Sequence, residues 1–230
     1  MIQSFKFELD WDNYEIFPRN IWTNPYVVFH GTSSYYSNDI EDKGFLRGFC
    51  PFDLNLVTEL IRVLQENVPL SEKVASDLDF YVRGQQRAPL RLSFFYRSYT
   101  CALYADGSFK GGQIFTHVKE AFNLLKPHMD YLSSSPLTEL FNILMQIKSQ
   151  PGIIYAVQLP NDLEGISAEL GVIYSKGNIS RDLIIGKVLL PNQLQTPELS
   201  LGESRKVNIS KINKPGNLGP ILYRRYNSED

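Results

Sequence analysis

The chain has 230 residues, 43% hydrophobic and 21% charged, so it can bury one large core and is not a disordered segment. Its formal net charge of -2 argues against a domain whose main task is to neutralise nucleic-acid phosphates. The N-terminus has no basic segment followed by an apolar one, and no stretch has the length of apolar residues that a membrane span needs, so we expect neither a signal peptide nor a membrane partner.

Strand patterns lie at both ends of a helical middle. In chain order, the sequence predicts a strand over 26–29, helices over 39–45, 53–64 and 71–82, a strand over 90–96, helices over 99–105, 114–131 and 136–150, and strands over 153–159, 170–174, 183–190, 206–212 and 221–226. The first strand is expected to end at His30. The chain therefore reads as an α+β protein.

Several helix boundaries have local signals. Asp53 and Ser71 can cap the helices that follow them, and Pro136 suits a first helical turn. Gly44 is expected to close the helix over 39–45 in a left-handed conformation. The helix after Asp53 should bury one face, at Leu54, Val57, Leu60, Ile61 and Leu64.

The common motifs for metal binding and hydrolysis are missing. His30, His117 and His128 are the only histidines, without a His-Glu-x-x-His motif or a cysteine pair at ligand spacing. The chain also lacks a phosphate-binding loop, a dinucleotide glycine fingerprint and a Gly-x-Ser-x-Gly nucleophile motif. Cys50 and Cys101 are expected to be free thiols. We therefore predict no metal cofactor.

Three features remain, in a fixed order along the chain. They are the strand that ends in Phe29-His-Gly-Thr-Ser33 with Gly44-Phe45 after it, the strand that ends at Tyr96, and Glu169 before a late strand. With the run Gly152 to Pro160 and the step Ile179-Ser-Arg-Asp-Leu-Ile184, they resemble the His-Tyr-Glu class of ADP-ribosyltransferases, which includes poly-ADP-ribose polymerases and diphtheria-type toxins. The resemblance covers about residues 22–190.

This resemblance implies that the chain binds NAD as its substrate. NAD would be held bent, with the nicotinamide amide on backbone groups, and Gly31 would let it approach the main chain. His30 would bind the ribose next to the adenine, and Tyr96 would stack on the nicotinamide ring. The expected cofactor-binding residues are His30, Gly31, Thr32, Ser33, Tyr96 and Tyr99.

The same resemblance assigns Glu169, His30 and Tyr96 as the catalytic residues. Cleavage of the glycosidic bond builds positive charge on the ribose, which a neighbouring carboxylate stabilises. Counted back from Ile179, the family's spacing falls nearer Leu170 or Gly171 than Glu169. If Gly171 holds the catalytic position, the chain has lost its carboxylate; Glu164 is a further carboxylate close by.

The resemblance implies one domain over residues 1–230, with its core at about 22–190 and C-terminal strands and a tail over 191–230. Two small facing antiparallel sheets would form a split NAD cleft with helices around it. The implied function is transfer of a single ADP-ribose to a macromolecule, with protein favoured over nucleic acid as the acceptor. Acceptor specificity is expected in loops such as residues 163–168.

Such a protein would act as a monomeric toxin or effector, either cytoplasmic or delivered into a host or target cell by a signal-free secretion route. Three alternatives stay open: an NAD glycohydrolase, an inactive module that binds NAD or ADP-ribose, and an RNA 2'-phosphotransferase. The slightly acidic composition disfavours the last, because that activity needs a basic surface.

Overall fold

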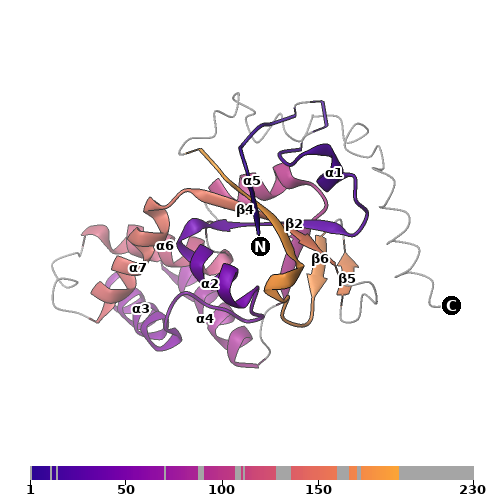
Figure 1. Cartoon of the computed structure of the whole chain (residues 1–230). Coiled ribbons are helices and arrows are strands. Elements are labelled where there is room, and N and C mark those ends of the chain that lie inside the picture. Colours follow the sequence, from indigo (N-terminus) through magenta and orange to yellow (C-terminus); the bar gives the residue numbers. More distant parts are fainter. Residues whose placement is uncertain are drawn as a thin grey trace.

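The computed structural model describes residues 2–10, 12–13, 15–69, 71–87, 91–106, 110, 112–127, 136–159, 166–169 and 172–191. In this part of the chain the strands form one sheet, with helices packed against it (Figure 1). The predicted strands over 206–212 and 221–226 lie outside the described residues, as do Glu164, Leu170, Gly171 and His128.

The sheet has seven strands in the order β1-β7-β4-β2-β3-β6-β5. They are β1 (Gln3–Phe5), β2 (Val27–Ser33), β3 (Leu92–Phe95), β4 (Gly152–Gln158), β5 (Ile166–Glu169), β6 (Val172–Ser175) and β7 (Ile184–Leu189). β1 and β7 are parallel, and all other neighbours are antiparallel. The α+β class is confirmed, but the described strands belong to one hydrogen-bonded sheet, so two separate sheets are not confirmed.

The helices agree well with the periodic patterns. They are α1 (Arg19–Trp22), α2 (Ser37–Lys43), α3 (Leu54–Asn67), α4 (Glu72–Arg87), α5 (Ser98–Asp106), α6 (Gln113–Leu125) and α7 (Leu137–Ser149), with 3-10 turns η1 (Ser34–Tyr36) and η3 (Arg181–Leu183). Asp53 caps α3 by accepting a hydrogen bond from the Asn55 N–H. Gly44 ends α2 with a φ of 81°, positive as expected, but its ψ of -165° is not that of the left-handed helical conformation. None of the described helices is long and apolar enough to cross a membrane.

Three short elements were not predicted. β1 and α1 have too few residues to show a periodic pattern. β5 was expected to be part of a loop, but it pairs with β6 in antiparallel fashion, so Glu169 ends one strand and also precedes the next.

Two hydrophobic clusters cover opposite faces of the sheet. The larger cluster joins β4 to α3, α4, α6 and α7 through residues such as Ile153, Tyr155 and Val157. The smaller cluster packs Ile154 and Ala156 against α5 and the N-terminal segment. Because β4 is covered on both faces, its sequence is an unbroken apolar run. Figure 1 shows α5 and α1 on one side of β2 and β4 and the other large helices on the other side.

The sheet is weakly joined in the middle. β2 pairs with β4 along its whole length, from Val27 to Ser33, but it pairs with β3 only at Phe29↔Phe95. The two strands therefore diverge beyond Phe29, at the position of His30.

Candidate functional site

His30 lies where β2 and β3 diverge. It was expected at the end of a strand, but β2 continues to Ser33, because Gly31, Thr32 and Ser33 pair with β4. The imidazole packs against the rings of Phe45 and Phe94, with centroids 4.7 and 5.5 Å away.

The hydrogen bond of His30 fixes the state of its imidazole. The Nδ1–H donates to the Ser93 carbonyl oxygen at 2.8 Å, across the gap between β2 and β3. Burial lowers the pKa of His30, so the ring is neutral at pH 7. In a neutral imidazole that donates through Nδ1, Nε2 is the hydrogen-bond acceptor. This arrangement is the one needed to accept a hydrogen bond from a ribose hydroxyl.

Gly31 is held by packing. A Cβ at this position would overlap the backbone carbonyl of Cys101 in α5, so the glycine lets the helix lie directly on the strand. We expected this glycine to admit a cofactor. The structure shows instead that α5 occupies the space beside its Cα.

Thr32 and Ser33, two further predicted ligands of NAD, are buried. Ser33 is fully buried; its hydroxyl donates to the Ile147 carbonyl at 3.2 Å and accepts from the Tyr35 N–H at 3.3 Å, so it ties β2 to α7 and caps η1. Thr32 is 7% exposed. In this conformation, hydroxyl contacts from these residues to a ligand would require movement of the strand.

The aromatic candidates lie around the junction of β3 and α5. Tyr96 follows β3 and is half-buried against the larger cluster, the cluster that also contains the Phe94 in contact with His30. Tyr99 is half-buried in the first turn of α5. His30 and Tyr96 are thus brought to the same side of the sheet.

One aromatic pair was missed by the sequence analysis. The rings of Phe95 and Tyr104 stack with centroids 5.0 Å apart and an interplanar angle of 25°, and Tyr104 is 39% exposed. Phe95 is adjacent to Tyr96 in the sequence but belongs to the other face of the sheet, with the smaller cluster. The sequence did contain a signal for this difference, because the side chains of neighbouring residues in a strand point to opposite faces of the sheet.

Residue 169 lies in the same register row as Phe95. Cα pairing connects Phe29 to Phe95, Phe95 to Val172 and Val172 to Glu169. His30 is in the adjacent row, opposite Tyr155. The strands that carry His30 and Glu169 are separated by three strand spacings, about 14 Å. The structure therefore places the strands of all three predicted catalytic residues in one sheet, with β6 between β3 and β5, and with residues 30 and 169 in different rows.

A buried carboxylate near this region was also missed. Glu15 is 3% exposed and accepts hydrogen bonds from the Ser98 N–H at 3.1 Å and the Ser98 hydroxyl at 2.7 Å. Burial raises its pKa to about 7, although the hydrogen bonds from Ser98 and the charge of Arg97 lower it. A single acidic residue in an irregular segment gives no sequence signal for burial.

Three polar side chains, those of Glu41, Lys187 and Tyr155, connect α2 to the sheet. The Lys187 ammonium lies 2.6 Å from both carboxylate oxygens of Glu41, and the Tyr155 hydroxyl donates to the same carboxylate at 3.2 Å. Burial, with the charge of Glu41, raises the pKa of Tyr155 far above its ordinary value. The phenol is therefore neutral and this group is structural.

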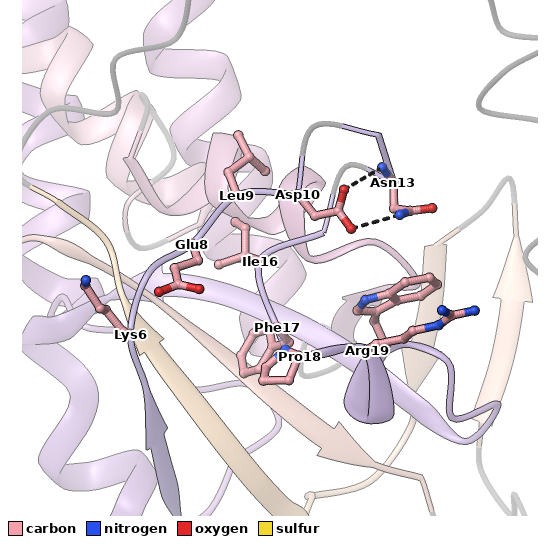
Figure 2. A pocket seen from close by; sticks show the side chains of 10 residues that line it. Lys6, Glu8, Leu9, Asp10, Asn13, Ile16, Phe17, Pro18 and Arg19 are labelled. Carbon is pink, nitrogen blue, oxygen red and sulfur yellow. Dashed lines mark hydrogen bonds between the residues drawn. The ribbon is translucent and has the colours of Figure 1, made fainter.

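A cavity of about 540 Å³ lies in the N-terminal segment rather than at His30 (Figure 2). Its lining includes Lys6, Glu8, Arg19 and Trp22. The polar side chains that line this cavity do not point toward one common position. Asp10, on the rim, accepts hydrogen bonds from the backbone and side chain of Asn13. Within the described residues, no cluster of three His, Cys, Asp or Glu side chains could hold a metal ion.

Comparisons of this chain with protein-family models, with curated proteins and with solved structures find no match.

Proposed function

We propose that the chain binds NAD where β2 and β3 diverge and transfers ADP-ribose to a macromolecular acceptor, with release of nicotinamide. The observation that carries the proposal is the state of His30, a neutral imidazole with its Nδ1–H bonded to Ser93. An acceptor nitrogen fixed in this way is suited to hold a ribose hydroxyl.

The spacing of the strands also supports a dinucleotide. About 14 Å separates the strand of His30 from that of Glu169, so one ligand that reaches both must be longer than a single nucleoside. Tyr96, on the same side of the sheet as His30, offers its ring for stacking on the nicotinamide.

In the proposed reaction, the bond between the ribose C1' and the nicotinamide nitrogen breaks, and nicotinamide leaves with the electron pair. The acceptor nucleophile forms the new bond to C1' and loses its proton. Glu169 would stabilise the positive charge on the ribose and orient the nucleophile. The same site would give NAD hydrolysis if water were the acceptor.

A second candidate is an NAD-binding module without transferase activity. The register favours it, because residue 169 and His30 are in different rows of the sheet. In that case NAD binds, but nicotinamide is not released.

Calorimetric titration of NAD into two His30 variants tests the binding claim. Asparagine places an amide N–H near Nδ1, so His30→Asn keeps a donor to Ser93 but removes the acceptor at Nε2. We expect at least about a tenfold loss of affinity, the value of one good hydrogen bond. His30→Gln, which places an amide oxygen near Nε2, should bind more tightly than His30→Asn. If the wild type does not bind NAD, the proposal is wrong.

Incubation with NAD labelled on the adenine, in a cell lysate, tests the reaction. Label attached to protein supports transfer, free labelled ADP-ribose supports hydrolysis, and unchanged NAD supports the binding module. Glu169→Gln should abolish nicotinamide release, whereas release that survives this change would contradict the assignment of Glu169.

A further inference from the structure

Glu15 joins the N-terminal segment to the start of α5. It follows a small hairpin in which Asp10 and Glu15 exchange backbone hydrogen bonds. Its carboxylate meets the first residue of α5, accepting from both the N–H and the hydroxyl of Ser98. The unpaired N–H groups of a first helical turn favour a negative charge, so this carboxylate caps the helix from a distant part of the chain.

Further hydrogen bonds join the N-terminal segment to the start of α5. The Ile16 N–H donates to the Ser98 hydroxyl at 2.7 Å, and Arg97 donates to the Asn13 carbonyl at 2.8 Å. Ser98 is fully buried and Glu15 is 3% exposed. The first turn of α5 is therefore attached to residues 13–16 by side-chain and backbone hydrogen bonds together.

α5 packs behind the candidate site, on the face of the sheet opposite the His30 imidazole. Its Cys101 carbonyl lies directly against Gly31, the residue after His30. Its Tyr104 stacks on Phe95, in the strand that diverges from β2. The start of α5 is therefore linked by direct contacts to β2 beside His30 and to β3.

We propose that Glu15 is a positioning residue that holds α5 against the candidate site and makes ligand affinity depend on pH. The effect on ligand affinity rests on the proposed NAD site. The link between Glu15 and α5 does not depend on that proposal.

The charged and titratable groups around Glu15, together with its burial, explain why its protonation changes near neutral pH. Arg97 lies 3.5 Å from its carboxylate, Asp10 on the same hairpin adds negative charge, and the buried Cys101 thiol of α5 is close enough for its own pKa to be raised, first by burial and then by the charge of Glu15. Burial raises the pKa of Glu15 to about 7, so both forms are populated near neutral pH.

Protonation changes the hydrogen bonds at α5. The charged carboxylate accepts from Ser98 and attracts Arg97. The neutral acid keeps an acceptor oxygen for Ser98, loses its ionic attraction to Arg97, and no longer carries a charge that is costly to bury. Because burial beside α5 raises the pKa of Glu15, protonation stabilises this buried arrangement, so we expect α5 to be held more firmly in the acid form and NAD to bind more tightly.

Two measurements on the full chain test this inference. In NMR titrations, the Glu15 carboxyl carbon and the amides of Ser98 and Ile16 should share one midpoint near pH 7, which Glu15→Gln abolishes. In calorimetry, NAD affinity should rise about fivefold from about pH 8 to about pH 6 in the wild type and stay constant in Glu15→Gln. Glu8→Gln, an exposed carboxylate of the same segment, should keep the wild-type profile.

The outcomes separate this inference from the proposed function. A Glu15 midpoint near 4.5, its ordinary value, or a Ser98 amide that does not follow the titration, would overturn the positioning role whether or not NAD binds. A shared midpoint near 7 without NAD binding would support the link to α5, overturn the effect on ligand affinity, and show that the proposed function is wrong.

Discussion

Gly31 is the residue at which α5 comes closest to the sheet. A methyl group there would overlap the Cys101 carbonyl, a backbone atom that cannot rotate away. We expect Gly31→Ala to lower the free energy of unfolding by about 1–3 kcal/mol, as overpacking does, and to be measurable by urea denaturation. In Gly84→Ala, the matched control, the new methyl group in α4 meets no atom within 4 Å, and the change should stabilise by about 0.5–1 kcal/mol. Equal effects at the two positions would contradict the close approach.

Glu15 should make stability fall as pH rises. Its pKa is about 7 in the folded chain and 4.5 when exposed, so between these values the folded state binds more protons than the unfolded state. The stabilisation is complete below pH 4.5 and is lost as pH rises through 7, with a total of at most about 3 kcal/mol. Urea denaturation across this range should show the decline in the wild type.

Glu15→Gln removes the titration and can keep an acceptor oxygen for Ser98. The variant should therefore be more stable than the wild type above pH 7 and should lose the decline between 4.5 and 7. A decline of unchanged size in the variant would assign it to other groups.

At the scale of elements, Glu41 and Lys187 attach α2 to β7. Their side chains are only 28% and 25% exposed, whereas the pair Asp39 and Lys43 on the same helix is 56% and 54% exposed. Double-mutant cycles should give a coupling of about 1–2 kcal/mol for the first pair and about 0.3–0.5 kcal/mol for the second, since water screens exposed pairs. Similar values for both would show that the half-buried pair is not special.

Elements long enough to repeat their hydrophobic pattern several times were predictable from the sequence, and very short elements were not. The apolar stripe of α3 buries Val57, Leu60 and Leu64 as expected, because a helix of this length repeats its pattern several times, whereas Leu54 and Ile61 are only partly buried. β5 has four residues, Ile166–Glu169, and its pairing with β6 gives it a strand structure that its own sequence does not indicate. The assignment of residues 163–168 to a loop was therefore wrong for residues 166–168, whereas residues 163–165 lie outside the described residues.

At the scale of the molecule, the helical layer and the sheet share one core. Leu140 in α7 is fully buried in the cluster that also contains Tyr155 of β4. Leu140→Ala should lower the free energy of unfolding by about 2–5 kcal/mol, and far-UV and near-UV circular dichroism should report one common transition. Met145→Ala, on the same helix but 42% exposed, should change it by less than about 1 kcal/mol. Separate transitions would show that the layers unfold independently.

Local periodicity and caps such as Asp53 were enough to predict the α+β class, the long helices with their buried faces, and the strand around His30. Contacts in the folded chain were needed to reveal the single sheet, the roles of Gly31 and Ser33 in packing, the pairing of Phe95 with Tyr104, and the burial of Glu15. The physical reason is that these properties belong to contacts between distant segments: β2 meets α5, and residue 15 meets residue 98, and no periodicity within either segment records its partner.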